Sequence, residues 1–166
     1  MKKLFEIIGA WIIVIVDFFY PPFKKYFTLQ FFRYGVTGVG NLLFDWILYF
    51  VIFNFILQKQ MLVLGFVTLS SHIATLAIKF PITLSSGFLL QKYVTFNNST
   101  NKGREQLLRY YFIAFINLGL NYFGLKLFVD ALNFYPSIAN AILSVIITIF
   151  SFFLQKKFTF KTPPIR

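Results

Sequence analysis

The sequence of 166 residues contains no cysteine, and only 13% of its residues are charged. Without cysteine, the chain cannot perform thiol catalysis or build a zinc knuckle or an iron–sulfur site. Soluble domains carry about 25% charged residues, so this chain lacks the polar coat that a soluble globular enzyme needs. The same composition excludes a disordered chain, a coiled coil and a disulfide scaffold.

Acidic residues number five, and there is one histidine. Five carboxylates leave little for acid–base catalysis, and the sequence shows no Ser/His/Asp set, phosphate-binding glycine loop, metal-ligand cluster or glycosyltransferase aspartate pair. His72, near the outer end of an apolar stretch, is expected to be an interfacial hydrogen-bonding residue. We therefore expect a protein that is not an enzyme and has no catalytic residue, metal or cofactor.

Hydrophobic residues make up 58% of the chain and aromatic residues 22%. A transmembrane helix needs about 20 mainly apolar residues. Four stretches meet that requirement, at residues 34–57, 69–90, 110–132 and 137–154. The sequence therefore predicts an all-α membrane protein with four transmembrane helices.

The net charge of +11 would indicate a nucleic-acid partner in a soluble protein. In a membrane protein, however, the position of each charge decides its meaning. Thirteen of the 16 Lys and Arg residues precede the first stretch, separate the second from the third, or follow the fourth. The positive-inside rule then places both termini and the middle loop in the cytoplasm, and we expect no nucleic-acid partner.

The first thirty residues form a separate segment. Residues 4–20 are apolar, but Glu6 and Asp17 leave only ten uncharged residues between them, and two prolines follow. A span here would place the flanking lysine pairs on opposite sides of the membrane, against the charge rule. We predict an interfacial helix on the cytoplasmic face, with a fifth span as the alternative. The expected organisation is residues 1–30 as this segment, 31–160 as the membrane domain and 161–166 as a cytoplasmic tail.

The chain also contains an internal repeat. At an offset of 76, residues 32–34 match residues 108–110, Asn41 matches Asn117 and Asp45 matches Asn121; at an offset of 64, residues 88–96 match residues 152–160. Each unit holds two spans, so both insert the same way up, as two parallel two-helix repeats about an axis along the membrane normal. The offsets differ by 12, so the first unit has about a dozen extra residues near 58–69, expected to be the outer loop and its return.

Short motifs mark the ends of the predicted spans. The first span begins with F-R-Y-x-x-x-G-x-x-N at residues 32–41, and the second ends with L-x-K-Y-x-x-F at residues 90–96. The fourth span repeats the latter motif at residues 154–160, with Lys157 in place of the tyrosine. Together these motifs resemble those of the GtrA-like family, and the resemblance covers about residues 31–160. It implies a role in cell-surface polysaccharide or teichoic acid glycosylation, through movement of a polyprenyl-phosphate-linked sugar across the bacterial inner membrane.

Polar residues recur on one face of each predicted span, and two of them are charged. Asp45 lies 12 residues after Arg33, and Lys79 lies 13 residues before Lys92. Both are therefore roughly 18–20 Å from the cytoplasmic entry at 1.5 Å per residue, a depth at which they could pair. Charges at mid-membrane usually line a substrate or ion path, although a static pair between helices is the alternative. The predicted substrate path consists of Asn41, Asp45, Lys79, Asn117 and Asn121.

Cationic residues form a second candidate site, at the cytoplasmic ends of the spans. The residues are Arg33, Lys92, Arg109, Lys156 and Lys157. Such residues anchor helices and obey the charge rule, and they can also bind a lipid phosphate, with arginine offering two parallel hydrogen bonds. Both uses are compatible.

The resemblance implies translocation of a polyprenyl-phosphate-linked monosaccharide to the outer leaflet, and the polar stripe suggests the route of its sugar. The rim cations would capture the phosphate while the lipid tail stays in the bilayer. One rival is a membrane scaffold that recruits a polyprenyl-phosphate glycosyltransferase through the basic loop 92–109. Another is a small drug or cation exporter, a class that relies on a membrane glutamate, which the four stretches lack. Expected partners are the lipid-linked sugar, membrane lipid and a membrane glycosyltransferase. Four spans make a thin wall around a path, so a homo-oligomer is a further expectation.

Overall fold

The computed structural model describes residues 2–63, 65, 68–99 and 103–161 and divides the chain into two compact units. Lys102, Arg166 and the rest of the predicted tail from residue 162 lie outside the described residues. The first unit is Met1–Asn97 and the second is Asn98–Arg166. The elements of the first unit are α1 (Lys2–Phe18), the short 3-10 helix η1 (Pro21–Phe23), α2 (Leu29–Val51), η2 (Ile52–Ile56), β1 (Leu62–Val63), β2 (Thr68–Leu69), α3 (Ser71–Leu90) and η3 (Gln91–Thr95). Those of the second are α4 (Gly103–Leu125), η4 (Lys126–Ala131), α5 (Pro136–Leu154) and η5 (Gln155–Thr159).

Four helices of the described chain are long and apolar enough to cross a membrane. They run over Leu29–Ile56, Ser71–Thr95, Gly103–Ala131 and Pro136–Thr159, and each overlaps one predicted stretch. The prediction of a helical protein with four spans is confirmed. The segment expected as the outer loop contains the small antiparallel pair β1–β2, in which Leu62 faces Leu69 and Val63 faces Thr68. The relation of the two units by an axis along the membrane normal stays a prediction.

Local sequence signals set the helix ends. The side chain of Thr28 accepts a hydrogen bond from the Phe31 amide at 3.3 Å, which caps the start of α2. Pro136 occupies the first turn of α5, where its missing amide costs no hydrogen bond. All four spans close in π-helical turns, and η3 and η5 end alike: Phe96 and Phe160 donate to the carbonyls of Gln91 and Gln155, each at 2.8 Å.

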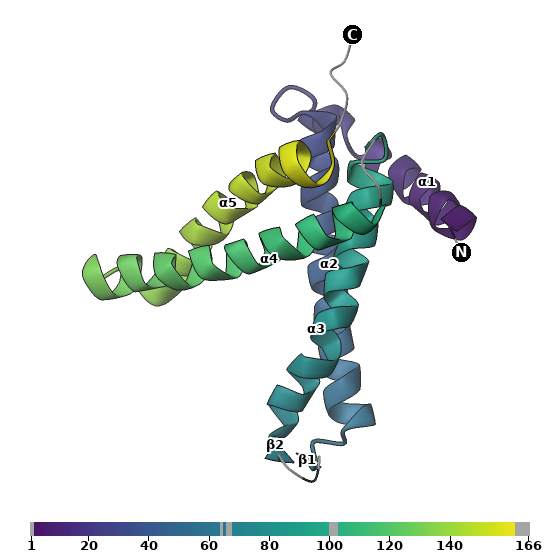
Figure 1. The fold of residues 1–166 in the computed structure, drawn as a ribbon. Helices are drawn as coiled ribbons and strands as arrows, with labels where there is room; N and C mark the ends of the chain where they lie inside the picture. The colour runs from purple at the N-terminus through teal and green to yellow at the C-terminus, as the bar shows by residue number, and fades with distance from the viewer. Residues whose placement is uncertain (1, 64, 66–67, 100–102, 162–166) are drawn as a thin grey trace. The chain divides into compact units, whose positions relative to one another are not determined.

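The core of the first unit lies where α2 packs against α3 and η3 (Figure 1). Phe96 is 1% exposed, and its ring centroid lies 6.4 Å from that of Tyr34. The buried hydroxyls of Thr37 and Thr95 are 3.3 Å apart. Large apolar side chains elsewhere on the spans are exposed, as expected of faces that meet lipid, because helices in membranes turn their small and polar residues toward each other.

Helix α1 lies across the end of the α2–α3 hairpin that is opposite β1 and β2 (Figure 1). Gly9 is buried against Tyr93 of η3, and Asp17 reaches Arg33 near the start of α2. Both contacts are at the same end of the hairpin, although they are eight residues apart along α1. A helix that spanned the membrane beside α2 would meet its partners at increasing depth. These contacts therefore support the interfacial placement over the fifth span.

The face of α1 that points away from the hairpin is apolar and exposed. Its residues are Leu4, Ile7, Ile8, Trp11, Val14, Ile15 and Phe18. Spacings of three and four residues place them in one stripe along the helix. Such a stripe, on a helix with charged residues near both ends, suits burial in the boundary between headgroups and acyl chains.

Replacing Gly9 by valine should release α1 from the hairpin. A Cβ atom at Gly9 would lie 2.9 Å from Tyr93 Cβ and 3.0 Å from the Tyr93 carbonyl oxygen, so the backbones must separate. We expect the added side chain to destabilise this contact by about 1–3 kcal/mol. A nitroxide on a cysteine introduced at Ile12, in this cysteine-free chain, should become more mobile. The control is Ala10→Val, because Ala10 is exposed; equal mobility in the two variants would contradict the packing.

Candidate functional site

An ion pair joins the middles of α2 and α3. Lys79 donates a hydrogen bond to a carboxylate oxygen of Asp45, and the two side chains are 13% and 22% exposed. The contact agrees with the equal depth that the sequence gives to the two residues. Lys79 also lies over the ring of Tyr49, with its ammonium nitrogen 5.5 Å from the ring centroid. Charges in a span persist only when they are paired or hydrated, so this pair is the strongest candidate site of the first unit.

Asn41 belongs to the packing between α2 and α3. Its amide nitrogen donates to the Thr83 carbonyl at 3.2 Å, and its amide oxygen accepts from the Ser86 hydroxyl at 2.6 Å. Both functional groups of the amide therefore have partners inside the helix pair. In this structure, Asn41 acts as a hydrogen-bonding contact between helices, and its place in the predicted substrate path stays a prediction.

The second unit presents its two predicted asparagines differently. The Asn117 amide nitrogen donates to the Ser151 hydroxyl at 2.9 Å. The amide oxygens of Asn117 and Asn121 are buried and have no hydrogen-bond partner among the described residues. A shallow groove of about 500 Å³ runs beside them, lined by Ala114, Asn117, Leu118, Asn121, Tyr122, Leu125 and Ile147. Buried amide oxygens without partners beside a groove are suited to accept hydrogen bonds from a hydroxyl-rich ligand.

The structure thus brings Asn41, Asp45 and Lys79 together in one unit and Asn117 and Asn121 together in the other. A path through all five residues involves both units and stays a prediction. Sequence reasoning missed Tyr49, whose hydroxyl lies 2.8 Å from Nδ1 of His72. Tyr49 follows Asp45 by four residues, so the spacing already placed it on the same face of α2. The expected hydrogen-bonding role of His72 is confirmed.

When the repeat offsets are extended along the spans, they pair residues of the first unit with residues of the second by sequence. Asp45 corresponds to Asn121 at the offset of 76, and Lys79 corresponds to Leu143 at the offset of 64. Leu143 packs on Gly124 of α4, where a Cβ atom would lie only 2.6 Å from Leu143 Cδ2. The second helix pair therefore packs through a leucine on a glycine, in place of an ion pair.

Two arginines of the predicted cationic rim occupy equivalent positions but have different partners. Arg33 binds Asp17 through two hydrogen bonds, Nε to Oδ1 at 2.8 Å and Nη2 to Oδ2 at 2.5 Å. Arg109 donates through Nη1 to the Phe158 carbonyl at 2.8 Å and lies 3.5 Å from a Glu105 carboxylate oxygen. Arg33 therefore presents the two-donor geometry that also fits a phosphate, but it is held by a carboxylate of α1.

The rim lysines lie over aromatic rings at equivalent positions of the two units. The ammonium of Lys92 is 5.6 Å from the Phe88 centroid and 5.4 Å from that of Tyr93. The ammonium of Lys156 is 5.8 Å from the Phe152 centroid, and Lys157 is exposed. A cation on a ring face stays close to the helix end. Their predicted role in phosphate binding stays a prediction.

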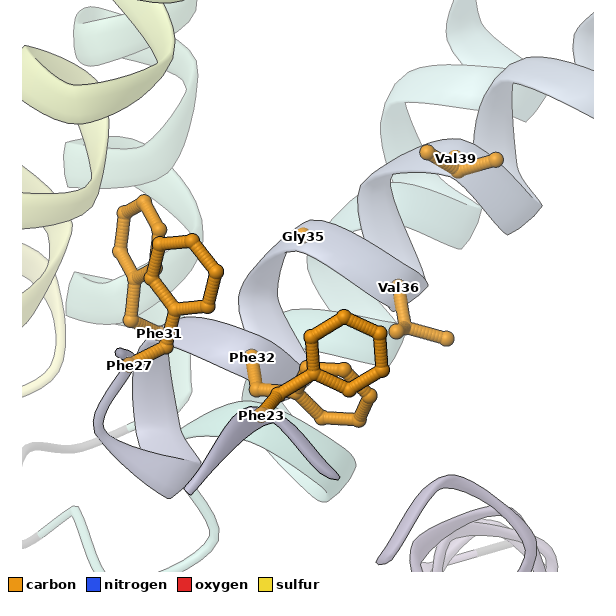
Figure 2. A pocket seen from close by; sticks show the side chains of 7 residues that line it. All are labelled: Phe23, Phe27, Phe31, Phe32, Gly35, Val36 and Val39. Atoms are coloured by element: carbon orange, nitrogen blue, oxygen red, sulfur yellow. The ribbon is translucent and has the colours of Figure 1, made fainter. Parts of the chain in front are cut away.

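An apolar groove of about 350 Å³ lies at the same end of α2 (Figure 2). Its lining consists of Phe23, Phe27, Phe31, Phe32, Gly35, Val36 and Val39. Gly35 leaves room in the floor, because a Cβ atom there would meet no atom within 4 Å. The groove suits an aliphatic chain. Among the described residues, no three or more His, Cys, Asp or Glu side chains gather as a metal site would require.

Comparison with known proteins gives one finding. The family model described as GtrA/DPMS, transmembrane domain, matches residues 33–160. Neither curated proteins nor solved structures gave a match.

Replacing Lys79 by leucine should destabilise the first unit, because it leaves the Asp45 carboxylate buried without its partner. Breaking such a pair costs about 3–5 kcal/mol. The double variant Asp45→Asn/Lys79→Leu copies the residues of the second unit, Asn121 and Leu143, and should recover most of this loss. Thermal unfolding in detergent micelles measures both effects. Additive losses in the double variant would contradict a direct interaction.

Proposed function

Because the chain belongs to the GtrA/DPMS transmembrane-domain family, we propose that it moves a polyprenyl-phosphate-linked monosaccharide across the bacterial inner membrane. It is a multi-pass membrane protein, and its family membership supports a role in handling lipid-linked sugars. The proposed transport would supply sugar to cell-surface polysaccharide or teichoic acid. In this proposal both termini and the middle loop are cytoplasmic, because the cations gather there.

The observation that carries the proposal is the Asp45–Lys79 ion pair inside the spans. A phosphodiester headgroup carries one negative charge, which the apolar bilayer interior disfavours. Lys79 can neutralise that charge at the membrane centre, and Asp45 neutralises Lys79 when no headgroup is bound. The asparagines of α4, beside their groove, supply hydrogen-bonding groups for sugar hydroxyls.

The cytoplasmic end of α2 offers features that suit the arriving lipid. Arg33 has the planar two-donor geometry that binds phosphate, and the apolar groove of Figure 2 lies on the neighbouring residues of the same helix. The groove would hold the first isoprene units while the rest of the tail stays in the bilayer. Arg33 would exchange Asp17 for the lipid phosphate.

The protein moves its substrate without altering it in this proposal. A membrane glycosyltransferase would therefore have to supply the lipid-linked sugar as its product. A homo-oligomer would complete the wall around the path, because four spans enclose little space. The identity of the sugar depends on that glycosyltransferase.

Transport of a short-chain polyprenyl-phosphate glucose analogue into proteoliposomes tests the proposal. We expect uptake by the unmodified protein. The uptake rate should fall roughly tenfold or more in Asp45→Asn and in Lys79→Met, because each variant removes one charge of the Asp45–Lys79 pair. Lys126→Met and Asp130→Asn are matched controls with the same chemical changes in η4, and they should transport normally.

The double variant Asp45→Asn/Lys79→Leu separates function from stability, since it should fold and still not transport. Normal uptake by this folded variant would rule out a role for the pair in transport. Absence of uptake by the folded unmodified protein would contradict translocation and favour a scaffold, whose partner binding should instead depend on the charges of loop 92–109.

Substituting Asp17 tests the exchange at Arg33. In Asp17→Asn the guanidinium loses its ionic partner, so the lipid phosphate meets less competition. We expect the KM for the lipid analogue to fall about fivefold, a modest coupling between two ligands of one site. Glu6→Gln, which removes an exposed carboxylate elsewhere on α1, is the control. A rise in KM in Asp17→Asn would show that Asp17 positions Arg33 for the substrate.

A further inference from the structure

The apolar groove beside α2 has walls made of paired phenylalanine rings. Phe23 stacks on Phe32 with ring centroids 5.1 Å apart. Phe27 stacks on Phe31 at 5.5 Å. In each pair, one ring comes from the segment that joins α1 to α2 and the other from the first residues of α2. Figure 2 shows the two pairs apart from each other. The groove therefore presents flat aromatic surfaces, with open space at Gly35.

The segment that joins α1 to α2 is held in shape by its own contacts. Prolines at positions 21 and 22 restrict its backbone, and the Tyr20 hydroxyl donates to the Phe27 carbonyl at 2.8 Å. The Phe27 amide donates in turn to the Phe23 carbonyl at 3.0 Å. The ring centroids of Tyr20 and Phe32 are 5.4 Å apart. These contacts fix the walls of the groove, so binding costs little conformational entropy of the protein.

Cationic residues accompany the groove along the chain. Lys24 and Lys25 are exposed between the two groove phenylalanines of the joining segment, and Arg33 follows Phe32 on α2. Asp17 pairs with Arg33, and residues 17–39 contain no other carboxylate. This part of the chain therefore carries net positive charge. An amphiphile with an anionic head and an apolar tail fits this combination of charge and groove.

The bilayer limits what can distinguish one lipid tail from another. Every tail is already in apolar surroundings, so entry into the groove gains nothing from the hydrophobic effect. Packing contacts and conformational entropy remain. A saturated chain rotates about each of its bonds and loses that freedom when it is held. An isoprene unit contains a planar double bond that does not rotate, so it loses less, and its flat face matches the faces of the phenylalanine rings.

We propose that this groove selects the substrate lipid by its tail, binding the isoprene units next to the phosphate in preference to the straight acyl chain of a phospholipid. This inference rests on the proposed function and names the feature by which the protein recognises its lipid. Charge alone cannot make the selection, because anionic phospholipids also carry a phosphate. The cations hold the phosphate of either lipid, and the phenylalanine pairs distinguish the tails.

Competition for binding of tritiated farnesyl phosphate tests the selection. The protein is held in phosphatidylcholine nanodiscs, and empty nanodiscs correct for partition into lipid. We expect unlabelled farnesyl phosphate to compete about fivefold more strongly than either of two saturated phosphates. Dodecyl phosphate has a straight chain of the same length, and hexahydrofarnesyl phosphate keeps the branches but has no double bond. Equal competition by all three would overturn the proposal, because binding would then depend on the phosphate alone.

Replacing Gly35 by leucine should fill the groove. A Cβ atom at Gly35 meets no atom within 4 Å, so the new side chain occupies the groove without displacing its neighbours. We expect the affinity for farnesyl phosphate to fall about tenfold or more, because the tail and the leucine compete for one space. Gly40→Leu is the matched control, since Gly40 is exposed on α2, has equal space around it and does not line the groove. Unchanged affinity in Gly35→Leu would contradict binding of the tail in this groove.

A milder variant tests the aromatic surface itself. Phe27→Leu keeps an apolar side chain and removes the flat ring. The affinity for farnesyl phosphate should fall about fivefold while that for dodecyl phosphate stays unchanged. Phe44→Leu is the control, because Phe44 is exposed to a similar extent on α2 and lies outside the groove. Equal losses for both phosphates in Phe27→Leu would show that the ring does not select the tail.

These binding measurements use lipids without a sugar and do not require transport. Selective binding by a protein that fails to take up the glucose analogue would support the groove and contradict translocation. Uptake of the analogue by a protein that binds all three phosphates equally would support translocation and overturn the selection by the tail.

Discussion

The hydrocarbon interior of a bilayer offers no hydrogen-bonding partner, so polar groups in the spans of this protein are stabilised when they find one within the protein. Helix formation satisfies the backbone, and several hydroxyls bond to the carbonyl one turn earlier, as Thr83 does to Lys79 at 2.9 Å and Thr75 to Ser71 at 2.7 Å. Asn41 and Ser86 satisfy each other between α2 and α3. Asp45 and Lys79 meet the same requirement for charge.

The two helix pairs meet this requirement in different ways, although their sequences repeat. The ends at η3 and η5 are alike: Gln91 and Gln155 are equally buried, and Lys92 and Lys156 lie over equivalent phenylalanines. Their middles differ, with an ion pair in the first unit and a leucine packed on a glycine in the second. The shared ends suit a common contact with lipid headgroups, and the different middles allow one unit to handle charge and the other to handle hydroxyls. This difference between the two units matches the proposed substrate, whose headgroup carries both a charged phosphate and sugar hydroxyls.

Helix α1 contacts the end of the first helix pair at which the proposed path begins. Its apolar stripe faces outward, while Gly9 and Asp17 hold it to η3 and α2. Since Asp17 accepts hydrogen bonds from Nε and Nη2 of Arg33, the position of α1 affects the state of the first cation that a lipid phosphate would meet. An interfacial helix that exchanges its carboxylate for a phosphate would thus link binding of the lipid to movement of α1 on the membrane surface.

The sequence by itself determined the membrane class, the number of spans and the depth of the two charges, because apolar length and the helical rise are local properties. Its motifs also indicated the family that the match over residues 33–160 established. Only the tertiary structure showed that Asp45 and Lys79 pair, that Asp17 holds Arg33, and that Tyr49 links the pair to His72. These contacts join residues 16 to 34 positions apart, and they depend on how one helix is rotated and shifted against the next. Periodicity assigns a residue to a helix face, but the packing of small residues such as Gly9 and Gly124 sets which faces meet.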